Sequence, residues 1–192
     1  VGVGNPISSG SGTGNTDSGD SSSDGSGGST TLPTQMVAVA GNPAAMVGET
    51  LNVDIIYDVS DDNANLTGLG LNIHYNSSLI TFVALSNVFQ GDVIQSAGLY
   101  IDADNLDDNV STDMYASVAW ASLDGNWPGV LPETLATVGF MVEEAAADED
   151  SVRIGFSSTS NAAGYALAGT LGALLPPVNA IASSQFPSFL GM

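Results

Sequence analysis

The chain has 192 residues; 21 are Asp or Glu and only Arg153 is Lys or Arg, so the formal net charge is −20. This balance excludes nucleic-acid binding and attraction to an anionic membrane surface, because both depend on Lys and Arg. The absence of Cys excludes disulfides, thiolate catalysis and iron–sulfur or zinc–thiolate sites.

The acidity comes mostly from aspartate, with 16 Asp against 5 Glu. Uncompensated negative charges destabilise a compact state by repulsion, and salt or divalent cations relieve that repulsion. The near-absence of Lys and Arg also leaves trypsin-like proteases almost nothing to cleave. We therefore expect a secreted protein, extracellular or at the cell surface, in a saline or calcium-containing medium. General acidity for solubility is the alternative.

The first 32 residues form a separate compositional region, in which Gly and Ser fill 18 positions. Such a segment buries too little apolar surface to offset its ordering entropy, so residues 1–32 are predicted to be a flexible tail or linker. At its tip, Val1, Val3 and Ile7 form a faint period-two pattern that predicts a strand over residues 1–7.

From residue 33 the pattern changes to short apolar strands between turn residues, with no amphipathic helix. The spacing predicts an all-β domain over 33–185, an antiparallel β-sandwich of about nine strands, followed by an apolar C-terminal tail over 186–192. The expected strands are Gln35–Ala40, Leu51–Asp58, Leu66–Tyr75, Leu79–Leu85, Val93–Ile101, Asp113–Ala121, Thr134–Val142, Val152–Ser157, a stretch near Tyr165–Leu171, and Val178–Ser184.

Four segments are similar to strands of cohesin modules and related bacterial Ig-like domains. They are Val47–Ile55 (VGETLNVDI), Leu66–Ile80 (LTGLGLNIHYNSSLI), Ala119–Ala121 (AWA) and Leu135–Val142 (LATVGFMV). The resemblance covers roughly residues 35–184 and implies a nine-stranded β-sandwich with jelly-roll topology. It also implies a partner-binding or surface-scaffold role, since cohesins bind dockerin modules. The Gly/Ser tail departs from the cellulosomal type, so dockerin binding does not carry over directly.

An acidic segment between two predicted strands is the first candidate metal site. Its carboxylates are Asp102, Asp104, Asp107, Asp108 and Asp113. Hard Ca²⁺ takes six to eight oxygen ligands from such side chains and from backbone carbonyls. The spacing does not fit an EF-hand, which requires an oxygen ligand where Leu106 stands. An irregular calcium site and a solvated acidic loop both remain open.

A second oxygen-rich cluster ends another predicted strand. It contains Asp58, Asp61 and Asp62, with Asn63 and Asn65 beside them. The side chains are of the same kind in a tighter loop, so this cluster is a further candidate for calcium.

The only histidine, His74, falls on the polar face of its predicted strand with Asn72, so it is expected to face solvent. No nucleophile elbow accompanies it, and the available glutamates lie in or beside strands and turns. We therefore expect no catalytic site and no enzyme activity. Trp120 is expected in the core; Trp127 either stacks on a sugar or partner or, more simply, covers the edge of the core.

Two hypotheses for function follow. The first is a secreted structural subunit that polymerises into a filament or surface layer with copies of itself through its terminal segments. The residues expected to make those contacts are Val1, Val3, Ile7, Phe189 and Leu190. The second is a cohesin-like binding module that recognises a dockerin-like domain or a polysaccharide. Neither hypothesis involves nucleic acid or insertion into a membrane.

Overall fold

The computed structural model describes residues 31–40, 43–89, 94–149 and 151–169. These residues form strands and one short 3₁₀ helix, η1 (Glu144–Asp148). The strands are β1 (Thr34–Val39), β2 (Thr50–Val59), β3 (Asn65–Leu66), β4 (Gly68–Tyr75), β5 (Ile80–Ser86), β6 (Ile94–Ile101), β7 (Met114–Ala121), β8 (Trp127–Pro128), β9 (Glu133–Val142), β10 (Gly155–Ser160) and β11 (Ala166–Gly169).

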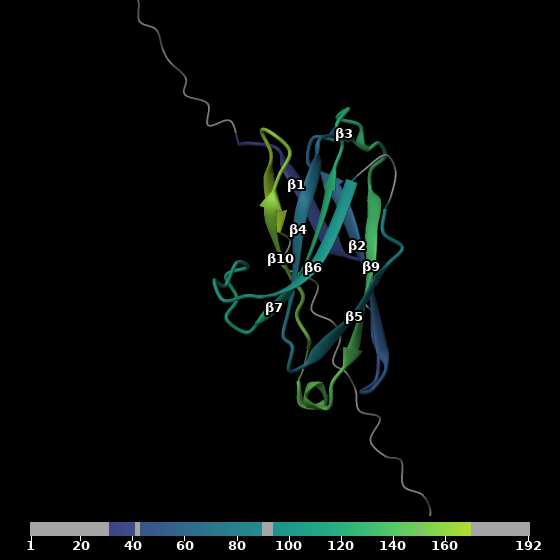
Figure 1. The fold of residues 1–192 in the computed structure, drawn as a ribbon, viewed down its shortest axis with the longest axis vertical. Coiled ribbons are helices and arrows are strands. Elements are labelled where there is room, and N and C mark those ends of the chain that lie inside the picture. The colour runs from purple at the N-terminus through teal and green to yellow at the C-terminus, as the bar shows by residue number, and fades with distance from the viewer. Residues whose placement is uncertain (1–30, 41–42, 90–93, 150, 170–192) are drawn as a thin grey trace, which may run out of the picture. The chain divides into compact units, whose positions relative to one another are not determined.

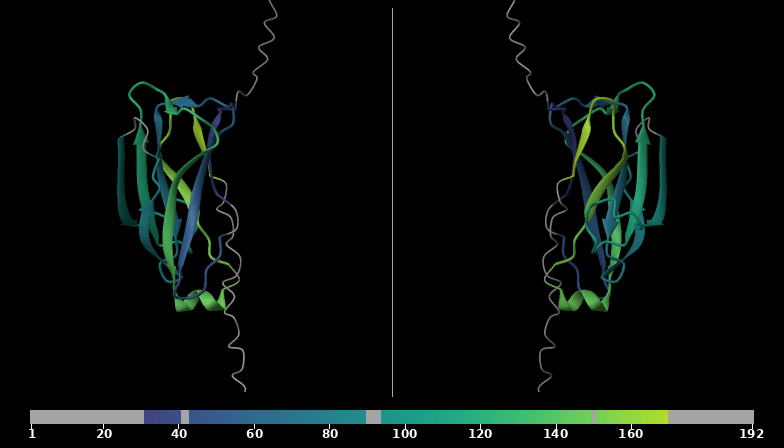
Figure 2. Two further views of the ribbon diagram at one scale, coloured as in Figure 1. Left: turned by 90° about the vertical axis from the view of Figure 1, so that its right-hand side faces the viewer. Right: turned by 90° about the vertical axis from the view of Figure 1, so that its left-hand side faces the viewer.

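The strands form two main sheets that pack as a sandwich (Figure 1). One sheet has the order β11-β1-β2-β9-β5 and the other the order β10-β4-β7-β6, while β3 and β8 make a small separate pair. Figure 2 shows the two sheets edge-on as adjacent layers. The predicted all-β sandwich is confirmed, with one difference: β11 pairs with β1 in parallel, whereas the other pairs are antiparallel.

The core lies between the sheets and is built by alternation. In β2, Leu51, Val53, Ile55 and Tyr57 are buried while the residues between them are exposed or partly buried, as period-two patterning requires. Strand β4 differs, because all eight of its residues are buried. Some other part of the chain must therefore cover the outer face of β4.

Aromatic rings fill the end of the core near β8. Trp127 is fully buried, with its ring centroid 4.7 Å from that of Tyr57 and 6.0 Å from that of Trp120. Trp120 is also buried, as expected. The position of Trp127 inside the core excludes its use as an exposed platform for a sugar.

A buried glutamine ties the two sheets together. Gln35 on β1 donates through Nε2 to Tyr57 Oη at 2.7 Å and to the Gly68 carbonyl at 3.0 Å, and its Oε1 accepts from the Ala162 amide at 2.8 Å. Burial raises the pKa of Tyr57 to about 12, since the charged phenolate would be poorly solvated there. Each polar group of this contact is thus satisfied inside the core.

The predicted strand Val178–Ser184, the N-terminal segment 1–30 and the C-terminal tail 186–192 lie outside the described residues, as do Val1, Val3, Ile7, Phe189 and Leu190. Within the described residues, no helix is long and apolar enough to cross a membrane.

Candidate functional site

Residues 102–112, which make up all but the last residue of the loop between β6 and β7, fold back over the outer face of β4. Its base is closed by the Asp102 amide, which donates to the Asp113 carbonyl at 2.9 Å. Asn105 and Asp108 adopt positive φ values of 54° and 55°, a conformation that Asn and Asp tolerate better than most residues. The Asp- and Asn-rich sequence therefore forms tight turns that keep the loop close to the sheet.

His74 lies beneath this loop and is fully buried, so the expectation that it faces solvent is wrong. The strand alternation does place it on the outer face, but the loop and the neighbouring strands cover that face. The ring of Tyr115, on β7, packs against the imidazole with a centroid distance of 5.1 Å. The burial arises from contacts between residues far apart in the chain.

Both ring nitrogens of His74 have partners. Nδ1 lies 2.8 Å from Asp102 Oδ2, and Nε2 lies 2.7 Å from the hydroxyl of Ser157 on β10. An ionised carboxylate only accepts, so Nδ1–H donates to Asp102 and Nε2 accepts from the Ser157 hydroxyl. The serine oxygen in turn accepts from Asn72 Nδ2 at 3.1 Å. A continuous hydrogen-bonded chain therefore runs from β4 through β10 to the loop.

Asp107 is the second carboxylate near the imidazole. Its Oδ1 lies 4.0 Å from His74 Nδ1 and accepts hydrogen bonds from Thr112 Oγ1 and from the Asn109 amide. Its other oxygen, Oδ2, is buried and has no hydrogen-bond partner. The carboxylate lies directly over Gly155, where an added Cβ would collide with Oδ2. The loop can approach β10 this closely only because residue 155 is glycine.

The acidic residues expected to bind calcium at 102–113 take different positions. Asp102 and Asp107 turn inward to His74, and a donor atom from each of these three side chains lies within 4.8 Å of the others. Asp104 and Asp108 are exposed. Asp113 accepts from the amide and hydroxyl of Ser77, at 2.7 and 2.6 Å, and so braces the turn after β4.

The cluster at 58–65 is arranged around a tyrosine. The Tyr165 hydroxyl donates to Asp61 Oδ2 at 2.8 Å and accepts from Asn63 Nδ2 at 3.0 Å. Asp58 accepts from the amide of Val59, and Asp62 has a positive φ of 58° in the turn. Calcium binding by Asp58, Asp61 and Asp62 stays a prediction.

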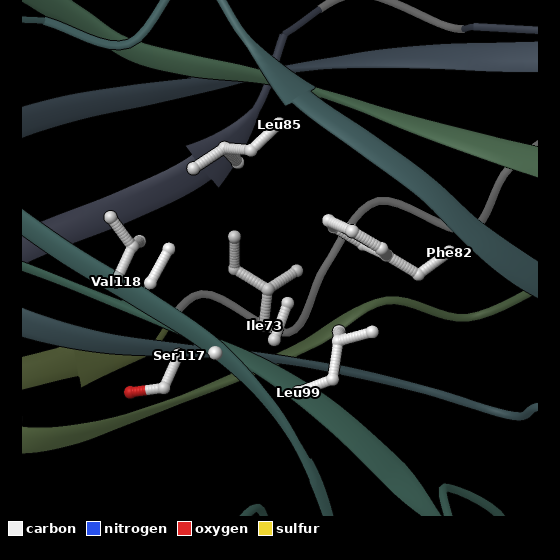
Figure 3. A pocket seen from close by; sticks show the side chains of 9 residues that line it. Ile73, Phe82, Leu85, Leu99, Ser117 and Val118 are labelled. Atoms are coloured by element: carbon white, nitrogen blue, oxygen red, sulfur yellow. The ribbon is translucent and has the colours of Figure 1, made fainter.

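A second feature is an apolar opening between the sheets along the edge strands β5 and β6, here called the β5–β6 seam. It encloses about 190 Å³. Figure 3 shows Ile73, Phe82, Leu85, Leu99 and Val118 turned towards this space, with the Ser117 hydroxyl pointing away. The full lining is Ile73, Phe82, Leu85, Ala97, Gly98, Leu99, Ala116, Ser117 and Val118.

Large apolar side chains on β5 and β6 stay exposed, although among them Leu99 alone belongs to the lining of the β5–β6 seam. Leu99 is 49%, Tyr100 51%, Ile101 75% and Val83 48% accessible. Within the described residues, β5 and β6 each end their sheet, so each has one edge without a strand partner. Sequence patterning identified these strands, but it could not show that they stand at the two edges of one opening.

The described fold can be set beside known proteins. The sequence matches no protein-family model, and no characterised protein resembles it by sequence comparison. In fold, the chain resembles cohesin modules. This is the resemblance that the sequence segments indicated.

Three solved cohesin structures illustrate the resemblance. The sixth cohesin of scaffoldin B from Acetivibrio cellulolyticus, solved with a Cel5 dockerin, has 12% identity and a TM-score of 0.48, and the match covers 74% of this chain and 96% of that one. The cohesin module of a family 33 glycoside hydrolase from Clostridium perfringens has 13% identity, a TM-score of 0.44, and coverages of 69% and 89%. A Clostridium thermocellum cohesin–dockerin complex, Coh-OlpA-Doc918, has 12% identity, a TM-score of 0.43, and coverages of 74% and 96%.

Proposed function

We propose that this chain is a non-catalytic, extracellular protein-binding module that takes a partner protein at the β5–β6 seam. The observation that carries the proposal is the apolar opening between the edge strands β5 and β6, with Leu99 half-exposed in its lining and Ile101 75% exposed two residues further along the same strand. Clustered exposed apolar surface is typical of interaction sites. An unpaired strand edge also offers main-chain hydrogen bonds to an incoming strand.

Charge bears on the kind of partner. A chain with a net charge of −20 repels other acidic proteins and attracts basic ones, so a partner with positive charge at the rim of its contact would associate fastest. Two of the cohesins that the chain resembles were solved with a dockerin bound. A dockerin-like domain is therefore the first partner class to test.

The seam can be tested at Ile101, which is 75% exposed and so contributes little to the core. We expect a photoreactive amino acid at position 101 to cross-link one domain from extracellular proteins of the source organism, saturably and in competition with unlabelled chain. Ile101→Ala should weaken binding of that domain by about 10-fold, the effect of an interface residue contributing ~1.4 kcal/mol.

Leu123 provides the matched control, because it is 90% exposed and lies in the loop after β7. A photoreactive group at position 123 should cross-link nothing saturably, and Leu123→Ala should leave the affinity unchanged. Equal cross-linking from both positions would show that the seam is not the binding surface.

Self-assembly is the second candidate function, and the alternation of Val1, Val3 and Ile7 favours it. Such a segment could add to a neighbour's edge strand, and the 24 residues of Ser8–Thr31 could reach ~80 Å when extended. Copies that each carry −20 would repel, so polymers should form only in high salt or with divalent cations. Sedimentation of the full chain and of a chain lacking residues 1–7, with and without salt, separates this candidate from the first.

The order Ser157–His74–Asp102 matches the hydrogen-bonding order of a serine hydrolase triad, so the non-catalytic proposal needs its own test. His74 is fully buried, Asp102 is only 8% exposed, and Ser157 is not among the residues that line the β5–β6 seam. We expect a fluorophosphonate probe to leave Ser157 unlabelled, as judged by intact-protein mass spectrometry. Labelling that Ser157→Ala abolishes would instead identify a nucleophile.

A further inference from the structure

We infer that His74, Asp102 and Asp107 form a binding site for a divalent transition-metal ion such as Zn²⁺. His74 comes from β4, and Asp102 and Asp107 both come from the 102–112 loop. One donor atom from each lies within 4.8 Å of the others. Ligands ~2.0–2.2 Å from a tetrahedral Zn²⁺ ion lie ~3.3–3.6 Å from one another. Asp102 Oδ2 and Asp107 Oδ1 lie 2.8 and 4.0 Å from His74 Nδ1, so these donor atoms would shift by about 0.5–1.5 Å on binding.

The balance of charge favours a cation at this point. The side chains of Asp102 and Asp107 are 0% and 3% exposed. Among the described residues, His74 is the only cationic side chain that pairs with either carboxylate. A single imidazole carries at most one positive charge against two carboxylates. Buried carboxylates without a compensating charge are costly, and a divalent ion would balance both.

An unsatisfied atom gives independent evidence. Asp107 Oδ2 is buried without a partner, while Oδ1 of the same carboxylate is fixed by Thr112 and Asn109. A buried acceptor left unpaired is uncommon, because water or a protein donor normally satisfies it. The carboxylate is therefore held through Oδ1, the oxygen 4.0 Å from His74 Nδ1, while Oδ2 lies buried over Gly155 with its acceptor capacity unused.

The neighbouring groups orient the other two ligands. Asp102 Oδ1 accepts from the Leu106 amide at 3.0 Å, which leaves Oδ2 directed at the imidazole. With a metal ion on His74 Nδ1, the ring proton would move to Nε2 and donate to Ser157 Oγ, which is already 2.7 Å away. Such outer hydrogen bonds fix the ring and tautomer of metal-binding histidines.

The donor set selects the class of ion. One imidazole nitrogen with two carboxylate oxygens suits Zn²⁺, Co²⁺ or Mn²⁺, whereas Ca²⁺ prefers a larger shell made wholly of oxygen. The site therefore differs from the calcium site predicted from the acidic sequence. Bound metal would join the loop to β4 and leave at least one coordination position for water.

The test is titration of the metal-free full chain with Co²⁺, followed by visible absorption, with Zn²⁺ and Ca²⁺ as competitors. We expect one Co²⁺ per chain, with visible bands that Zn²⁺ abolishes and millimolar Ca²⁺ does not. Asp107→Asn removes a ligand with little change of shape and should weaken binding at least about 100-fold. Ser157→Ala removes an outer hydrogen bond and should weaken binding by about 10-fold to 100-fold.

Asp104→Asn is the matched control, since it removes the same charge from an exposed position in the same loop. It should change the affinity by no more than about 2-fold. The site is refuted if the wild-type chain gives no saturable Co²⁺ spectrum, if Ca²⁺ competes as well as Zn²⁺, or if Asp104→Asn weakens binding as much as Asp107→Asn. Circular dichroism of each metal-free variant checks folding. If Asp107→Asn does not fold, the loss of Co²⁺ affinity in Ser157→Ala is the test of the site.

Discussion

Replacing His74 by alanine is expected to lower the free energy of unfolding by about 3–5 kcal/mol, measured by urea denaturation in EDTA. The side chain is fully buried and pairs with Asp102 at 2.8 Å. Its removal leaves that carboxylate buried without its partner and takes away the contact that holds the 102–112 loop on β4. Removing one member of a buried pair is far more costly than losing an exposed ion pair.

Two comparisons make this expectation specific. Ser157→Ala removes the hydrogen bond to His74 Nε2 and the one that Asn72 Nδ2 donates to the same hydroxyl, but no ion pair, and should cost about 1–2 kcal/mol. Asp102→Ala combined with His74→Ala should cost clearly less than the sum of the single changes, because the two residues interact directly. A cost below about 1 kcal/mol for His74→Ala would mean that the loop is held by other contacts.

Local patterns were sufficient to predict most of the fold. Alternation in β2 and β4, together with the turn residues between strands, located nearly every strand to within a few residues. The core position of Trp120 was also predicted from its strand. The parallel pairing of β11 with β1 was not predicted, since it joins residues more than 120 positions apart and leaves no periodic signal.

The candidate metal site depends on contacts between segments that are distant in the sequence. The sequence marked Asp102 and Asp107 as ligands among five equivalent carboxylates, but it could not separate them from Asp104 and Asp108. Which side of the loop faces the sheet is decided by its turns and by the clearance over Gly155. His74 was assigned to the correct face of β4, yet its burial depends on a loop 28 residues away.

The β5–β6 seam was missed for a related reason. Leu99 and Ile101 alternate as core residues should, and alternation alone predicts that both are buried. Leu99 is half-exposed and Ile101 is 75% exposed because, among the described strands, β6 ends its sheet and β5 ends the opposing one. Strand order, which no local pattern encodes, therefore determines where this molecule presents apolar surface.

A second large effect is expected at Trp127. Trp127→Ala should lower the free energy of unfolding by about 3–5 kcal/mol, since it empties a fully buried ring site at the centre of an aromatic cluster with Tyr57 and Trp120. Leu123→Ala, in the loop just before β8 and 90% exposed, should change it by less than about 0.5 kcal/mol. Urea denaturation followed by far-ultraviolet circular dichroism measures both.

Trp127→Phe separates the volume of the ring from its polar atom. The indole Nε1 is buried without an acceptor, and an unsatisfied buried donor costs about 1–3 kcal/mol. Phenylalanine removes this donor and keeps much of the packing, so the two effects oppose each other. The substitution should therefore cost less than half as much as Trp127→Ala. Equal costs for the two variants would show that Nε1 is satisfied in solution, through a buried water or a local rearrangement of the β3–β8 pair.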